Sequence, residues 1–321
     1  MIEVKNLTKN YGSFAALKGI SFHIEKGEVI GFLGPNGAGK TTTMRILTCF
    51  MPPTSGRAIV AGYDVFSDSL AVRKRVGYLP ENVPLYHEMT THGYLKYVAK
   101  IKGTPQKELT NRIDYVMNAC GLLDRQHQII GQLSKGYRQR VGLAQSLIHN
   151  PDVIILDEPT SGLDPRQVIE IRELVKELGK DRTIILSTHI LAEVSLTCER
   201  VIIINEGEIA GDILLSNGGV SSIERASGTQ ASLNNSNTLD LEIHGNPQEI
   251  ESALAEIPGV DVIDIRDSIY RVSYPIDVDL RSNISSTIIS KGWKLLEMRS
   301  IEMTIEEVFL RLTSRHNQPP T

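Results

Sequence analysis

Residues 34–42 read GPNGAGKTT, in which two glycines enclose four residues and a Lys-Thr pair follows. This spacing is the pattern of a phosphate-binding loop. Residues 29–33 before it are apolar, and residues 42–50 after it can continue as a helix. Glycines let backbone N–H groups turn inward without Cβ clashes, and the helix N-terminus adds its positive dipole end. The residues expected to bind a nucleotide are Gly34, Pro35, Asn36, Gly37, Ala38, Gly39, Lys40, Thr41 and Thr42.

The loop and a later strand carry residues suited to phosphate chemistry. Lys40 is placed to reach the β- and γ-phosphates, and Thr41 is placed to hold Mg²⁺. Residues 153–158 read VIILDE, an apolar strand that ends in Asp157 and Glu158. Buried parallel strands commonly end at the sheet edge where ligands bind. We expect Asp157 to bind Mg²⁺ through water and Glu158 to polarise the attacking water.

A second possible anion site lies between these motifs. Residues 133–140 read LSKGYRQR, and an apolar-periodic helix follows. Ser134 is a good N-cap, and a helix start with a hydroxyl group and a glycine can hold an anion. A capped helix is all that these residues require by themselves, so a function for them depends on the motifs around them.

The order of these motifs resembles the ATP-binding subunit of ATP-binding-cassette (ABC) transporters, whose signature helix begins LSGGQ. The resemblance covers roughly the first two-thirds of the chain, on the usual domain scale. It implies an α/β fold, the P-loop NTPase cassette with a helical subdomain, and ATP and Mg²⁺ as cofactors. It further implies that Ser134 and Gly136 contact the nucleotide and that Tyr11 stacks on adenine.

Three more segments match the family by position. Residues 161–164, SGLD, resemble the D-loop and place Asp164 among the nucleotide-site residues. His189 ends the apolar run 184–188 and resembles the switch histidine, whose imidazole can hydrogen-bond a γ-phosphate. Glu81, in GYLPE at 77–81, sits where the family has its Q-loop. The resemblance makes Glu81 and His189 catalytic residues with Glu158, and Glu81 a further Mg²⁺ ligand.

Two departures from the family pattern indicate a subfamily. Glu81 replaces the Q-loop glutamine, so the amide donor is lost while an oxygen remains. The signature has Ser-Lys-Gly-Tyr where the family has Ser-Gly-Gly-Gln. Both changes resemble bacterial exporters of the daunorubicin-resistance, sodium-efflux and gliding-motility type. That resemblance implies a separate membrane permease, a second ATPase copy and a peripheral location on the cytoplasmic face of the plasma membrane.

Composition agrees with such a subunit. The formal net charge is -4, so no global basic field favours nucleic acid. The apolar runs are strand-sized, well short of the roughly 18 to 20 residues that span a bilayer, and the N-terminal residues lack a signal-peptide core. The three cysteines are widely spaced and match no metal-ligand pattern, so we expect ordinary thiols in a reducing compartment.

The pattern changes after the cassette, which we place at residues 1–215 with its helical subdomain at about 90–150. Residues 216–237 are rich in Ser, Asn and Gly, a linker composition. Residues 238–313 show the order β-α-β-β-α-β of a ferredoxin-like unit, a small α+β accessory domain. A terminal helix follows within it, with Thr304 and Glu307 as a capping box, and residues 314–321 form a tail.

Two other functions fit a cassette sequence less well. A soluble ABC ATPase that acts on ribosomes or DNA usually carries two cassettes or a long inserted coiled coil, whereas this chain shows one cassette and no room for that insertion. A binding regulator that has lost hydrolysis is the third reading, but Lys40, Asp157, Glu158 and His189 are all present. We therefore expect an ATP-hydrolysing subunit that powers export through ATP-driven dimer closure.

Overall fold

The computed structural model describes residues 1–216, 219–224, 236–266, 268–275, 278–301 and 304–314. Its centre is a seven-stranded sheet in the order β11-β10-β9-β3-β8-β7-β6. The strands from β6 to β9 pair in parallel, whereas β10 pairs antiparallel with β9. The strands are β3 (Val29–Leu33), β6 (Val76–Leu79), β7 (Val153–Asp157), β8 (Thr183–Thr188), β9 (Arg200–Asn205), β10 (Glu208–Ser216) and β11 (Gly219–Glu224).

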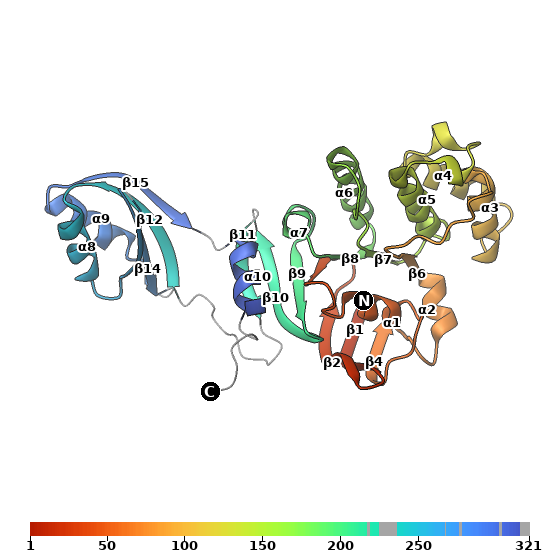
Figure 1. Ribbon diagram of the computed structural model, residues 1–321, viewed down its shortest axis with the longest axis horizontal. Coiled ribbons are helices and arrows are strands. Elements are labelled where there is room, and N and C mark those ends of the chain that lie inside the picture. Colours follow the sequence, from red (N-terminus) through yellow and green to blue (C-terminus); the bar gives the residue numbers. More distant parts are fainter. Residues whose placement is uncertain (217–218, 225–235, 267, 276–277, 302–303, 315–321) are drawn as a thin grey trace.

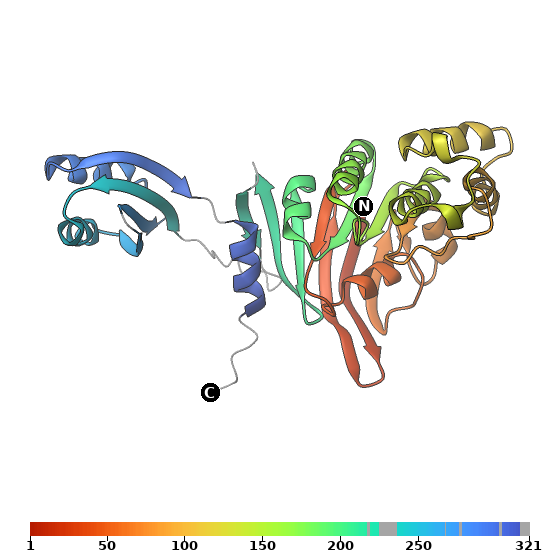
Figure 2. The same cartoon turned by 45° about the horizontal axis from the view of Figure 1, so that its top comes forward.

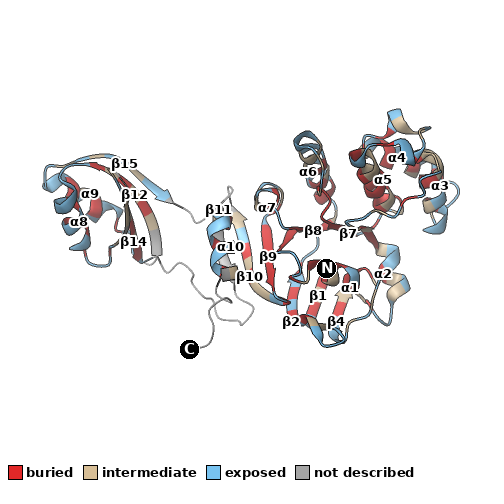
Figure 3. Cartoon of the chain, in the orientation of Figure 1, coloured by how far each residue is buried: buried red, intermediate tan, exposed pale blue. Residues whose placement is uncertain are grey.

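Each face of this sheet packs a separate apolar core. Along β7 the side chains alternate: Ile154 and Leu156 join one core, and Val153 and Ile155 join the other. Figure 3 shows the resulting band of buried residues along the central strands. Because strand side chains point to opposite faces in turn, an entirely apolar strand is what a sheet covered on both sides requires.

One face is covered by a second, antiparallel sheet and by the helix that follows the phosphate loop. This sheet has the order β2-β1-β4-β5 and extends below the central sheet in Figure 2. Its strands are β1 (Ile2–Tyr11), β2 (Phe14–Ile24), β4 (Ser55–Val60) and β5 (Tyr63–Asp64). Helix α1 (Lys40–Leu47) contributes Met44, Ile46 and Leu47 to the shared core.

The other face is covered by helices. The expected helical subdomain is present as α3 (Thr91–Ile101), α4 (Leu109–Ala119) and α5 (Lys135–Leu147), which cluster at one end of the molecule (Figure 1). Helices α6 (Pro165–Gly179) and α7 (Leu191–Thr197) continue the layer, and α2 (Ser69–Arg75) precedes β6. Among the described helices, none is both long and apolar enough to cross a bilayer. The fold is thus the expected α/β cassette.

The C-terminal domain has the predicted order of elements. It consists of β12 (Ser236–His244), α8 (Pro247–Ala255), β13 (Asp261–Arg266), β14 (Ile269–Pro275), α9 (Arg281–Ser290) and β15 (Lys294–Ile301). The sheet order β13-β14-β12-β15, with every neighbouring pair antiparallel, is that of a ferredoxin-like unit. Leu239, Leu241 and Val272 lie in a core of its own.

Two boundaries differ from the sequence-based expectation. Gly219–Glu224, within the expected linker, is strand β11 and pairs with β10, while residues 217–218 and 225–235 lie outside the described residues. The terminal helix α10 (Ile305–Ser314) has the predicted capping box, in which Glu307 N donates to Thr304 Oγ1 over 3.3 Å. Its buried side chains pack on the cassette and not on the accessory domain.

Candidate functional site

The phosphate loop runs from the end of β3 to the start of α1, as its sequence predicts. Gly37 and Gly39 have φ angles of 81° and 111°, which L side chains rarely adopt. A Cβ at Gly39 would also lie 2.9 Å from the Ala16 carbonyl oxygen, so the loop needs glycine there for space as well. Lys40 begins α1, and its Nζ donates to the carbonyl oxygens of Gly34 (2.8 Å) and Pro35 (3.2 Å).

Asp157 ends strand β7 and is fully buried. Its Oδ1 accepts a hydrogen bond from Ser187 Oγ over 2.6 Å, and its Oδ2 has no hydrogen-bond partner among the described residues. Burial raises the pKa of this carboxyl, and the nearby hydroxyl groups of Ser187 and Thr41 act in the opposite direction. A buried carboxylate oxygen without a donor is suited to a cation.

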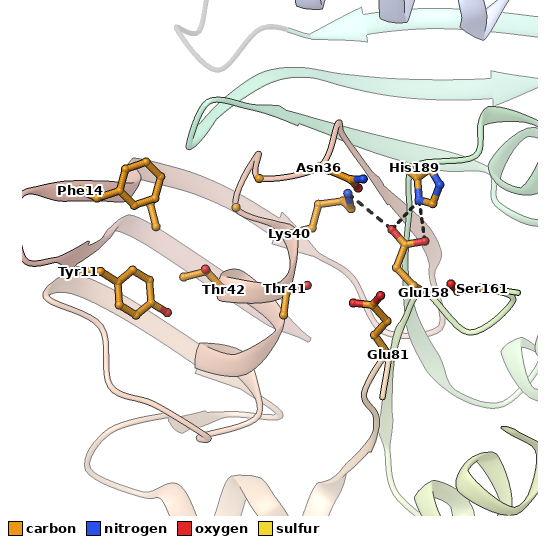
Figure 4. A pocket seen from close by; sticks show the side chains of 13 residues that line it. Tyr11, Phe14, Asn36, Lys40, Thr41, Thr42, Glu81, Glu158, Ser161 and His189 are labelled. Atoms are coloured by element: carbon orange, nitrogen blue, oxygen red, sulfur yellow. Dashed lines mark hydrogen bonds and ion pairs between the residues drawn. The ribbon is translucent and has the colours of Figure 1, made fainter. Parts of the chain in front are cut away.

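The side chain of the next residue, Glu158, lies between Lys40 at the start of α1 and His189 after the end of β8. Its φ of 49° is unusual for a residue with a side chain. Both carboxylate oxygens lie within hydrogen-bond distance of His189 Nδ1, at 2.9 and 3.0 Å (Figure 4). Lys40 Nζ lies 3.6 Å from Glu158 Oε1. A cation, a carboxylate and an imidazole therefore meet at one point above the carboxyl ends of the central strands.

These groups line a cavity of about 540 Å³, a volume in the range of small-molecule sites. Figure 4 shows two aromatic rings at the end of the cavity away from Glu158, those of Tyr11 and Phe14. Their exposed fractions are 45% and 62%, so both rings offer a free face for stacking. The lining residues are Tyr11, Phe14, Ala16, Asn36, Gly37, Gly39, Lys40, Thr41, Thr42, Glu81, Glu158, Ser161 and His189.

Phe14, Ala16 and Ser161 are lining residues that the sequence had not placed in the site. Phe14 lies opposite Tyr11 in the β1–β2 register, and two aromatic residues flanking the short Gly-Ser turn were a signal that could have located it. Ser161 belongs to the segment at residues 161–164 that resembles the D-loop. Its place in the cavity follows from the backbone turn after Glu158, closed by a hydrogen bond from Ser161 N to the Glu158 carbonyl oxygen.

Six predicted nucleotide residues and the predicted metal ligand Asp157 do not line this cavity. Gly34, Pro35 and Ala38 belong to the phosphate loop itself, whereas the other three lie at helix starts elsewhere. Ser134 is the N-cap of α5 and accepts a hydrogen bond from Tyr137 N over 3.3 Å. Gly136 is buried, and a Cβ there would collide with the side chain of Gln167. Asp164 is the N-cap of α6 and accepts from Gln167 N over 3.0 Å. Within one chain, these residues form helix starts outside the pocket.

The unusual signature residue Tyr137 has a structural environment. Its half-buried ring packs against the cassette core, and the guanidinium groups of Arg125 and Arg140 lie 5.1 and 6.0 Å from the ring centre. Cations over an aromatic face are attracted by its quadrupole. The aromatic ring that replaces the family glutamine therefore packs the start of α5 against Arg125, in the segment that follows α4.

Comparisons with known proteins agree with the geometry. A family model described as ABC transporter matches residues 17–161. The chain is 31% identical over 312 residues to the uncharacterized ABC transporter ATP-binding protein YxlF of Bacillus subtilis, covering 97% of this chain and 99% of the relative. It is 39% identical over 215 residues to the bacitracin transport ATP-binding protein BcrA of Bacillus licheniformis, covering 66% and 69% respectively.

Solved structures give the same answer for the cassette. A dimeric ATP-binding cassette in a post-hydrolysis state, bound to ADP and Pi, matches with a TM-score of 0.62 at 27% identity. The match covers 68% of this chain and 100% of that one. With its phosphate loop, strand-end carboxylates and near full-length relative, the chain belongs to the ATP-binding proteins of ABC transporters, the subunits that bind and hydrolyse ATP to power membrane transport.

Proposed function

We propose that this chain is the ATPase of an exporter whose permease is a separate chain, and that two copies close on two ATP molecules at the cytoplasmic face of the plasma membrane. One observation carries the proposal. The cavity of a single chain gathers Lys40, Glu158 and His189, whereas Ser134 and Gly136 lie outside it. A second copy, or a close relative, can supply those helix-start residues to the open side of the cavity.

Within the cavity, each side chain has a distinct role in ATP binding and hydrolysis. Tyr11 stacks on adenine, with Phe14 beside it, and the loop N–H groups hold the phosphates. The Lys40 ammonium group exchanges its hydrogen bonds to the loop carbonyl oxygens for contacts with phosphate oxygens. Glu158 accepts a proton from the attacking water, and the hydrogen bond to His189 orients its carboxylate. The cavity thus holds all the groups needed for phosphoryl transfer except those of the second copy.

The residues present also fit Mg²⁺. Asp157 offers its Oδ2, which is buried without a hydrogen-bond partner among the described residues, and Thr41 and Glu81 offer oxygens from the cavity lining. Oxygen ligands of this kind, completed by phosphate oxygens and water, are what Mg²⁺ prefers. When bound, the ion neutralises charge on the β- and γ-phosphates. Glu81 can serve here although it lacks the amide of the usual glutamine, because only its oxygen is required.

The γ-phosphate couples chemistry to motion. It is the group that both the phosphate loop of one copy and the α5 start of the other would contact, so ATP favours the closed pair and hydrolysis removes the link. A ligand shifts such an equilibrium only through contacts that differ between the two states. The contacts to Ser134 and Gly136 are those that exist only in the closed pair. Closure and opening would then move the permease.

Glu158→Gln tests this proposal, because the amide keeps the shape of the side chain and removes the base. We expect ATP turnover to fall by roughly 10²-fold or more, the usual scale for a general base. The closed pair should persist, so light scattering after gel filtration in Mg-ATP should show a dimer that dissociates when ATP is removed. Glu173→Gln, an exposed change on α6, is the matched control and should behave as wild type. A Glu158→Gln chain that stays monomeric in Mg-ATP, or that still hydrolyses ATP at the wild-type rate, would contradict the proposal.

A further inference from the structure

The segment that carries His189 is held by a side chain outside the cavity. Strand β8 ends at Thr188 and α7 begins at Leu191, so His189 lies in the short connection between them. Thr188 Oγ1 donates to Glu193 Oε2 over 2.8 Å and accepts from Ile190 N over 3.1 Å. One hydroxyl group therefore fixes the backbone on both sides of His189.

Glu193 is itself held firmly. It lies in the first turn of α7 with 8% of its surface exposed, and its backbone N donates to the Ile190 carbonyl oxygen over 3.2 Å. It borders a small gap between α6 and α7, which is lined by apolar side chains such as Ile171 and Leu186 and also by Arg172. A carboxylate in such surroundings is costly unless it accepts hydrogen bonds. Thr188, which is fully buried, supplies one.

His189 depends on this support because little else holds it. Its side chain is 46% exposed, so packing restrains the ring weakly, yet Nδ1 lies within hydrogen-bond distance of both Glu158 oxygens. The position of the ring therefore follows from the backbone at residues 188–190. A displacement of about 1 Å at a catalytic group can reduce turnover by as much as 10²-fold.

We propose that Glu193 is a positioning residue for ATP hydrolysis: its carboxylate holds the Thr188 hydroxyl, and this contact sets His189 against Glu158. Glu193 does not line the cavity. It acts through Thr188 alone, so only the hydrogen-bond acceptor at Glu193 and the donor at Thr188 matter. The proposal rests on the catalytic roles proposed for Glu158 and His189.

Paired substitutions in the full chain test it. Glu193→Ala removes the acceptor and Thr188→Val removes the hydroxyl with almost no change of shape. Each should lower kcat by about 10-fold or more and leave the KM for ATP within about twofold, because the phosphate loop is untouched. Glu193→Gln and Thr188→Ser keep an acceptor and a donor, so each should retain kcat within about threefold of wild type. Glu199→Gln, an exposed change just beyond α7, is the control and should leave kcat unchanged.

The double variant, Glu193→Ala with Thr188→Val, decides whether the two residues act as one unit. We expect its kcat to match that of the single variants, because contacting residues are not additive. Multiplicative losses, or a Thr188→Val enzyme with wild-type kcat, would overturn the proposal. If Glu193→Ala does not yield folded protein, the Thr188→Val and Thr188→Ser pair decides by the same criterion.

Glu158→Gln is measured in the same assay. If it keeps wild-type turnover, the proposed function fails. If it alone lowers kcat, only the role of Glu193 fails.

Discussion

Lys40 lies where the phosphate loop meets the catalytic carboxylate. Its ammonium group is buried, and the two loop carbonyl oxygens and Glu158 surround it. The Glu158 carboxylate is therefore close enough to balance the lysine charge. The phosphates of ATP would compete with Glu158 for the Lys40 ammonium group. Glu158 would then keep its hydrogen bond to His189, which is the pairing used in hydrolysis.

The buried carboxyl group of Asp157 affects both the stability of the fold and the binding of Mg-ATP. Because burial raises its pKa, the folded protein holds the proton more tightly than the unfolded chain does. The sign follows: stability is lost as pH rises from the ordinary carboxyl pKa of about 3.9 through the folded value. We expect Asp157→Asn, free of nucleotide at pH 7, to melt about 2 °C or more above wild type, with a difference that shrinks at lower pH. Its stabilisation by Mg-ATP should be smaller than that of wild type. A thermal melt below wild type at pH 7 would show that the carboxylate is not the destabilising group.

Local motifs explain why so much of the site could be predicted. The loop at residues 34–42, the carboxylates that end β7 and His189 at the end of β8 each lie beside the strand that positions them. Parallel pairing of β3, β7 and β8 brings those strand ends to one edge. Tyr11 was predicted through the family resemblance, whereas Phe14 was missed because only its pairing with Tyr11 across the β1–β2 hairpin places it beside the cavity.

Helix α10 shows what a pattern within one element leaves open. The spacing of Ile305, Val308 and Leu312 predicts an amphipathic helix, but an apolar stripe does not identify its partner. The structure packs the three residues into the cassette core, where α10 contacts α7 and β10. The chain therefore leaves the cassette, forms the accessory domain and returns. A fragment ending near residue 216 would lack both β11 and α10, so the polar composition of residues 216–237 alone does not define a cassette that folds independently.

Two leucines on α10 provide a matched test of this packing. Leu312 is 6% exposed and Leu310 is 62% exposed. We expect Leu312→Ala to lower the free energy of unfolding of the cassette by about 2 to 3 kcal/mol, the scale for a buried leucine, and Leu310→Ala to change it little. Urea unfolding of each variant, measured with and without ATP, should detect this difference in the free energy of unfolding of the cassette. Fluorescence of Trp293, the single tryptophan, reports the accessory domain separately. Equal effects of the two changes would mean that α10 is not part of the cassette core.

The architecture of the chain could be predicted from the sequence because, in both the cassette and the accessory domain, the order of strands and helices along the chain agrees with the fold that they form. The accessory domain follows its β-α-β-β-α-β order, and its core is distinct from the two cores of the cassette. The order of elements does not by itself predict how two chains pair, and Ser134 and Gly136 are not among the residues that line the cavity of one copy. The proposed composite site would be a property of two chains together, so its test needs two kinds of chain.

That test mixes two inactive variants. Lys40→Ala disables the phosphate loop, and Ser134→Glu places a negative charge where the γ-phosphate of the other copy would lie. Each alone should be inactive, because every site in its dimer has one defective half. Mixed dimers contain one intact site, made from the Lys40 of one chain and the Ser134 of the other, so an equal mixture should recover roughly a quarter of wild-type ATP turnover by random pairing. A mixture that stays as inactive as its two components, although both bind each other in gel filtration, would show that each chain completes its own site and would contradict the two-copy account.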